Sequence, residues 1–177
     1  MKIRGVHFSN RIVVPPMCQY SAHEGYVDDW HLVNLGRFAM GGAGLIITEA
    51  TAVQKKGRIT HGCPGLWTDE QIIGHSRIAQ FISRNGAIPG IQLGHAGRKA
   101  SMQRPWHGNG PLNEDDFTRG DMPWKIVAPS ACSVDDGWEI PEELSVEKID
   151  ELIDDFVTAA IRAVRAGYRV IELHGAH

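Results

Sequence analysis

The stretch Arg169-Val170-Ile171-Glu172-Leu173-His174-Gly175-Ala176-His177 runs from an apolar strand pattern directly into two histidines. Its apolar part is short and rich in β-branched residues, as is typical of a parallel strand that is buried on both faces. In an α/β barrel the reactive side chains stand at the C-terminal ends of such strands. We therefore expect His174 and His177 to lie at the mouth of a barrel.

Three earlier segments have the same character. They are residues 12–14, 44–48 and 88–93. Pro89 is awkward in a central strand because it cannot donate to a hydrogen-bonded ladder, and it leaves the start of the third strand undecided. Residues 2–8 followed by 9–12 indicate a small hairpin that closes the bottom of the barrel.

A helical pattern precedes each of the last three strands, with a capping residue at its start and glycine after its end. The signals are Asp28 or Asp29 with Gly41-Gly42, a Thr68/Gln71 capping box with Gly86, and Ser145 with Gly167. The segment from about 101 to 144 is a long loop. Its tryptophans, Trp106, Trp124 and Trp138, predict ordered packing over the top of the sheet.

Four strands in this order predict either a TIM (β/α)8 barrel or an open doubly wound sheet. The residues after the first strand, Pro15-Pro16-Met17-Cys18-Gln19-Tyr20, contain no glycine-rich phosphate fingerprint. This absence favours the barrel. A complete barrel typically takes about 250 residues. We therefore expect residues 1–177 to be the N-terminal part of a single barrel domain, with about four strands and without the C-terminal half.

The composition excludes several classes of function. The formal net charge is −3, which gives no electrostatic basis for binding nucleic acid or an anionic membrane. No apolar run reaches the roughly 20 residues that span a bilayer, and the N-terminus lacks a signal-peptide pattern. The three scattered cysteines make no disulfide framework, so a cytoplasmic location is expected.

The strand ends carry many hydrogen-bonding groups and one thiol but few carboxylates. This inventory suits a flat, polar-edged cofactor and a substrate oxygen better than glycoside hydrolysis. Two imidazole donors at His174 and His177 could polarise a carbonyl as an oxyanion hole does. They could equally bind zinc together with Cys63 or His61, as in a metal-dependent hydrolase or a zinc-binding module.

Several motifs together resemble the Old Yellow Enzyme family of flavin ene-reductases. The similarity is greatest to the bacterial branch of NADPH dehydrogenases and xenobiotic reductases, and it covers the N-terminal half of the family's barrel. The motifs are residues 15–20 (PPMCQY), 49–53 (EATAV), 57–59 (GRI), 91–99 (IQLGHAGRK) and 174–177 (HGAH).

The resemblance implies a barrel that binds FMN without a covalent bond, with NADPH or NADH as the hydride donor. It assigns the flavin-binding positions to Pro15, Pro16, Met17, Cys18, Ala50 and Gln92. Cys18 would lie beside the flavin ring, and Gln92 would bind its pyrimidine edge. Tyr20 would face the substrate. His174 and His177 would donate hydrogen bonds to the carbonyl oxygen of an α,β-unsaturated compound, which makes these three the expected catalytic and substrate-binding residues.

The resemblance also implies limits. The family's usual proton-donating tyrosine would fall beyond His177, as would the loops that hold the FMN phosphate. An isolated 177-residue chain is therefore expected to be inactive. The expected partners are small molecules, and the family suggests a homo-oligomer.

Overall fold

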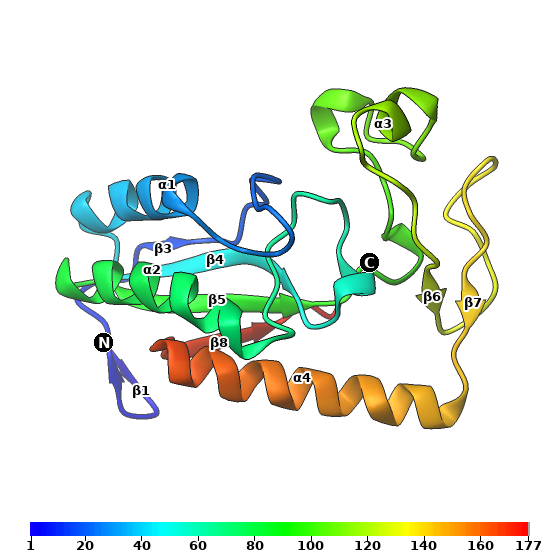
Figure 1. Cartoon of the computed structure of the whole chain (residues 1–177). Coiled ribbons are helices and arrows are strands. Elements are labelled where there is room, and N and C mark those ends of the chain that lie inside the picture. The colour runs from blue at the N-terminus through cyan, green and yellow to red at the C-terminus, as the bar shows by residue number, and fades with distance from the viewer. Residues whose placement is uncertain (177) are drawn as a thin grey trace.

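The computed structural model describes residues 1–176 and contains a parallel four-stranded sheet (Figure 1). Its strands are β3 (Val13–Val14), β4 (Leu45–Ala52), β5 (Ile88–Gly94) and β8 (Val170–Leu173), in the spatial order β3-β4-β5-β8. The four predicted strands are confirmed. Because neighbouring strands are parallel, their C-terminal ends meet at one edge of the sheet.

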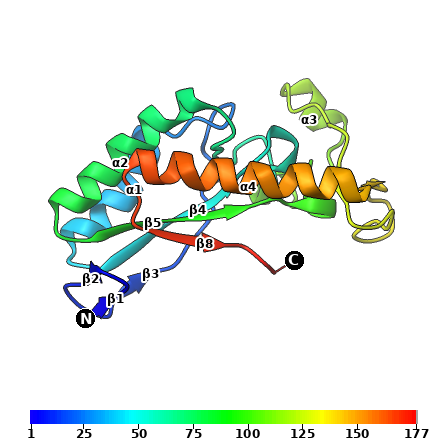
Figure 2. The ribbon, with the colours of Figure 1, turned by 90° about the horizontal axis from the view of Figure 1, so that it is seen from below.

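Three long helices cover one face of this sheet (Figure 2). They are α1 (Asp29–Met40), α2 (Ile72–Arg84) and α4 (Val146–Ala166). Two apolar clusters fill the space between helices and sheet. One surrounds Ile46 beneath α1 and α2, and the other surrounds Ile91 and Leu93 beneath α2 and α4. Burial of this area supplies the main drive for folding.

The predicted capping residues are found where helices begin and end. The Asp28 carboxylate accepts from the Trp30 N–H at the start of α1, and Ser145 accepts from the Lys148 N–H at the start of α4. At the second helix the Gln71 side chain accepts from the Thr68 N–H, within a 3-10 turn, η2 (Asp69–Gln71), that leads into α2. Gly167 ends α4 in the left-handed conformation that glycine adopts at little cost.

The other face of the sheet is covered only at its N-terminal end. Strands β1 (Lys2–Ile3) and β2 (Val6–His7) form the predicted hairpin. Phe8, directly after it, packs on Leu45 and Ile47. The hairpin therefore closes the bottom of the sheet's inner face and leaves the C-terminal end of that face open.

Pro89 lies inside β5, between two neighbours, without breaking the ladder. Its carbonyl accepts from the Arg169 N–H, and β8 pairs with β5 only from Gly90 onward. The donor that proline lacks is therefore not needed, because no β8 residue is paired opposite this position.

The segment predicted as one long loop contains regular structure that the sequence did not indicate. It holds the 3-10 turn η4 (Pro105–His107), helix α3 (Glu114–Thr118), and strands β6 (Val127–Ala128) and β7 (Glu142–Glu143), and a further 3-10 turn, η3 (Gly97–Lys99), precedes it. Figure 1 shows it extending beyond the C-terminal edge of the sheet. Trp124 packs edge-on against His61, as expected of an ordered segment. Trp106 is 60% exposed but also makes an edge-on contact, with the Tyr20 ring at 6.2 Å between centroids.

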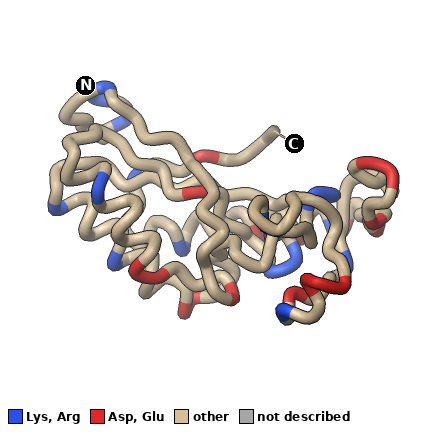
Figure 3. The backbone as a smooth tube through the Cα atoms, turned by 90° about the horizontal axis from the view of Figure 1, so that it is seen from above, with Lys and Arg blue, Asp and Glu red and all other residues tan. Residues whose placement is uncertain are grey.

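Charges of both signs are interspersed along the chain, as Figure 3 shows. No helix among residues 1–176 is long and apolar enough to cross a membrane.

A second apolar stripe on α4 has no partner among the described residues. Its members are Val146, Ile149, Ile153, Val157, Ile161 and Val164, which are 38–70% exposed. Their spacing of three and four residues places them along one side of the helix. β8, the strand that follows α4, is the last strand of the sheet and has no neighbour on its outer edge among the described residues. Its Leu173 is 65% exposed. Contiguous apolar surface beside an unpaired strand edge favours association.

We therefore predict that the 177-residue chain self-associates through this stripe. Val157→Lys should shift the chain toward monomer in sedimentation velocity experiments at micromolar concentration, because it places a charge in the apolar contact. The neighbouring exposed Thr158→Lys is the control and should leave the distribution unchanged. A wild-type chain that is monomeric throughout would contradict the prediction.

Candidate active site

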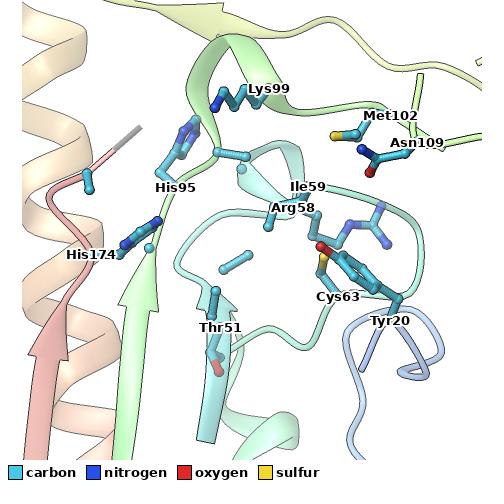
Figure 4. Close-up of a pocket in the computed structure, with 16 residues that line it drawn as sticks. Tyr20, Thr51, Arg58, Ile59, Cys63, His95, Lys99, Met102, Asn109 and His174 are labelled. Atoms are coloured by element: carbon cyan, nitrogen blue, oxygen red, sulfur yellow. The ribbon is translucent and has the colours of Figure 1, made fainter. Parts of the chain in front are cut away.

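A cavity of about 280 Å³ opens at the C-terminal edge of the sheet (Figure 4). It is bounded by the ends of β4, β5 and β8 and by the loops that follow them. Small residues make up much of its wall and leave room for a flat ligand. Those residues are Ala50, Ala52, Gly57, Gly94, Ala96 and Ala176.

Of the residues predicted for the site, Tyr20, Ala50 and His174 line this cavity. Figure 4 shows Tyr20 and His174 entering it from opposite sides. Cys18 and Gln92 are not among the lining residues, and neither are Pro15, Pro16 and Met17, which form the segment that leaves β3 at the same edge and leads to Cys18. His177 lies outside the described residues.

Gln92 has a partner on the inner face of the sheet. The register pairs Gln92 with Glu172 across β5 and β8, and the Gln92 Nε2 donates to Glu172 Oε1 at 2.6 Å. The side chain is 8% exposed. One amide hydrogen bond is thus already made, and the Gln92 carbonyl oxygen remains as an acceptor for a ligand's polar edge.

Cys18 and Tyr20 are neighbours, and both are neutral at physiological pH. Burial raises the pKa of the Cys18 thiol to about 12 and that of the Tyr20 phenol to about 12. A hydrogen bond links the two side chains, and the backbone of Ala50 also bonds to the thiol. Cys18 is therefore a polarisable, uncharged group at this edge rather than a thiolate nucleophile.

Glu49, within β4, is a buried carboxyl group that belongs to the motif at residues 49–53 but for which no role was predicted. It is 3% exposed, and its Oε2 accepts from the Gln19 N–H at 2.8 Å. Burial raises its pKa to about 7, against the opposing effect of backbone hydrogen bonds from Gln19 and Tyr20. Its Oε1 lies 3.7 Å from His31 Nε2, a buried ring nitrogen on α1.

His95, which follows β5, supplies a neutral donor to the same region. Its Nδ1 accepts from the Gly97 N–H, so the proton is on Nε2, and Nε2 is buried without a hydrogen-bond partner among residues 1–176. Burial lowers the pKa of the imidazole to about 4. A buried donor without a partner costs free energy unless a ligand or water satisfies it.

The cavity also includes residues that were not expected to bind the flavin or the substrate, among them Cys63, which was considered only as a zinc ligand. Arg58, Ile59 and Cys63 come from the loop after β4, and Lys99 comes from the turn after β5. Met102 and Asn109 come from the long segment at residues 101–144. Arg58, Ile59 and Lys99 belong to motifs noted in the sequence. Nothing local to Met102 or Asn109 could have indicated their place.

The zinc alternative gains no support from the described part of the chain. Within residues 1–176, no three or more His, Cys, Asp or Glu side chains form a group that could hold a metal ion. Cys63 instead accepts from the Thr60 N–H, and His61 packs on Trp124.

The comparison with known families is decisive. The model of the NADH:flavin oxidoreductase / NADH oxidase family matches residues 1–177. The chain belongs to this family. It is 48% identical over 176 residues to "NADH:flavin oxidoreductase FG08077" of Gibberella zeae and 41% identical over 177 residues to an NADPH dehydrogenase of Bacillus subtilis. Both alignments include 99% of this chain but only 42% and 46% of the relatives' sequences. The chain therefore spans about half the length of these relatives.

Solved structures of the family confirm the predicted TIM-barrel class. An Old Yellow Enzyme from Pichia sp. superimposes on all of this chain with a TM-score of 0.81 and 26% identity, over 45% of its own length. Morphinone reductase superimposes on 96% of the chain with a TM-score of 0.78 and 25% identity, also over 45% of its length. The four-stranded sheet thus corresponds to about half of such a barrel.

The described residues fit the family's cofactor, FMN. A flat ring with a polar edge needs a low wall and hydrogen-bonding groups around it. The small residues of the cavity leave space for the ring, and the unsatisfied His95 Nε2 is a hydrogen-bonding group at its wall. The Gln92 oxygen lies outside the lining, on the strand that leads to it, β5.

The raised pKa of Glu49 predicts a pH-dependent stability. The folded protein binds this proton more tightly than the unfolded chain, so its stabilising contribution is complete below about pH 4.5 and is lost as pH rises through about 7. The free energy of unfolding should therefore fall between pH 5 and pH 8 by on the order of 3 kcal/mol more in the wild type than in Glu49→Gln. Urea unfolding at both pH values measures this. Equal falls in the two proteins would contradict the burial effect.

Proposed function

We propose that the chain supplies the flavin face and the substrate-activating histidines of an FMN-dependent NAD(P)H ene-reductase, as part of a single barrel domain. The substrates would be α,β-unsaturated carbonyl compounds. One observation supports this most strongly: Tyr20, Ala50 and His174, which come from three separate strand ends, line one cavity beside Cys18. Family membership supports the oxidoreductase chemistry.

When bound, FMN would accept hydride from a nicotinamide and deliver it to the alkene carbon β to the carbonyl. The residues of this chain would hold the reacting groups in place. Cys18 and Ala50 would border the ring, and the Gln92 amide would bond to its polar edge, with Glu172 fixing the orientation of that amide. Because Cys18 and Tyr20 are neutral, they would not place a negative charge beside the ring that repels the incoming hydride.

The role proposed for His174, with His177, is to donate hydrogen bonds to the substrate carbonyl oxygen. Negative charge grows on this oxygen as hydride reaches the β carbon. Donors aimed at that position accelerate the reaction because they bind the enolate-like state more tightly than the ground state. Tyr20, across the cavity from His174, would contact the substrate from the other side.

Flavin binding is tested on the protein expressed from its complete gene. The purified protein should be yellow and should release FMN on denaturation. Gln92→Ala should raise the FMN dissociation constant by about tenfold, the value of roughly one hydrogen bond in a buried site. Gln80→Ala, an exposed amide on α2, is the control. A colourless protein that does not bind added FMN would remove the proposal.

The histidine role predicts an unequal effect on the two half-reactions. In stopped-flow experiments, His174→Ala should slow alkene reduction by the reduced enzyme by about 10²–10³-fold, the usual cost of one oxyanion-type donor. Flavin reduction by NADPH should be largely retained. His7→Ala, on the exposed β2 hairpin, should match the wild type in both. Equal losses in both half-reactions would refute the assigned role.

A further inference from the structure

The segment from Cys18 to Tyr20 has a conformation that must be held in place. Tyr20 has a φ of +52°, in the left-handed region that a residue with a side chain adopts only when its surroundings require it. Two side chains of the proposed site, the Cys18 thiol and the Tyr20 phenol, project from this segment. Whatever fixes its backbone therefore fixes both groups at once.

One constraint comes from the loop after β4. Gly62 approaches so closely that a β-carbon there would lie 2.0 Å from the Tyr20 carbonyl oxygen, and the Gly62 carbonyl accepts from the Ala22 N–H at 2.9 Å. This contact restricts the position of the Tyr20 carbonyl group. It does not satisfy the N–H groups of Gln19 and Tyr20.

The second constraint is Glu49. Its carboxyl group accepts from the Gln19 N–H and is also hydrogen-bonded by the backbone of Tyr20. Its other oxygen faces the His31 imidazole at 3.7 Å. His31 is itself fixed by the start of α1, where Nδ1 lies 3.0 Å from the Asp28 carboxylate. A chain of contacts thus runs from the exposed Asp28 through His31 and Glu49 to the backbone between Cys18 and Tyr20.

A carboxyl group is an unfavourable side chain at a buried position. Burying it costs several kcal/mol unless its hydrogen bonds are made. Glu49 does not line the cavity, so contact with a ligand gives no reason for its presence. The titratable groups around it are His31, Cys18, Cys63, Tyr20 and Tyr168, and no Lys or Arg among the described residues makes an ion pair with it. Its strongest contact is with the segment that carries the two ligand-facing groups.

We propose that Glu49 is the positioning residue of this site, and that its carboxyl group sets where Cys18 and Tyr20 stand against the bound flavin and the substrate. The inference rests on the proposed function, because it names what the segment is positioned against. Displacement of an active-site group by about 1 Å can change rates by up to 100-fold. A side chain that touches neither ligand can therefore adjust both the flavin and the substrate site.

The adjacent residue on the same strand provides a matched control. Thr48 is as deeply buried as Glu49, but its hydroxyl lies 3.2 Å from the Tyr168 hydroxyl, beneath the helices. Thr48→Val removes a buried hydrogen bond from β4 without touching the Cys18–Tyr20 segment. Loss of stability alone should therefore affect both variants, whereas loss of positioning should affect only Glu49→Ala.

The experiment compares Glu49→Ala and Thr48→Val in the flavin-loaded protein from the complete gene. Both should melt at a lower temperature. In Glu49→Ala, the visible spectrum and the reduction potential of the flavin should shift and the KM for the alkene should rise by about tenfold. Thr48→Val should retain the wild-type spectrum, potential and KM. Glu49→Gln keeps an oxygen that can accept from the Gln19 N–H. Its spectrum, potential and KM should therefore be close to those of the wild type.

Wild-type spectrum, potential and KM in Glu49→Ala, or equal changes in Thr48→Val, would overturn the inference and leave the proposed function standing. If the unaltered protein binds no flavin, the proposed function fails and the inference with it. Should Glu49→Ala not fold, Glu49→Asp replaces it. The shorter side chain withdraws the carboxyl from the Gln19 N–H, so the same shifts are expected, and wild-type values would again overturn the inference.

Discussion

The parallel alignment of β3, β4, β5 and β8 is the constraint on which the site depends. Parallel pairing brings four strand ends to one edge, although the residues that follow them are separated by up to about 155 positions in the chain. The register also matters at the level of single residues. It places Gln92 beside Glu172, and a slip of β8 by one residue would turn Glu172 to the opposite face of the sheet, away from Gln92. The apolar clusters under α1, α2 and α4 hold this register in place.

The parts of the fold that the sequence predicted are those with local causes. Ser145 and Gly167 mark the ends of α4 because a capping hydroxyl and a left-handed glycine act on their own turn of helix. The four strands were recognisable from their apolar β-branched runs. The helix and strands within residues 101–144 were not, because α3 has only five residues and β6 and β7 are two-residue strands whose paired residues lie 15 positions apart in the chain. Pairing of that kind leaves little pattern in either segment.

The site divides in the same way. Tyr20, Ala50 and His174 were predicted because each follows a strand end and belongs to a motif, and all three line the cavity. Glu49 belongs to one of the same motifs, yet its importance was not apparent. Its role arises from burial against Gln19 and His31, which are 30 and 18 residues away. Met102 and Asn109 line the cavity because the folded segment at residues 101–144 passes beside it. The residue types at strand ends can be read from sequence, but the contacts that orient them depend on the folded chain.

The central claim is that the flavin ring lies across the C-terminal edge of this sheet, with Cys18, Ala50 and Gln92 on one side and His174 facing the substrate space. A crystal structure of the protein from the complete gene, grown with FMN and an unreactive carbonyl ligand, tests it most directly. We expect electron density for the ring beside Cys18 and Ala50, with its polar edge at Gln92 and the ligand oxygen at His174. A ring bound elsewhere, or a metal ion held by His174 and a cysteine in its place, would contradict the account.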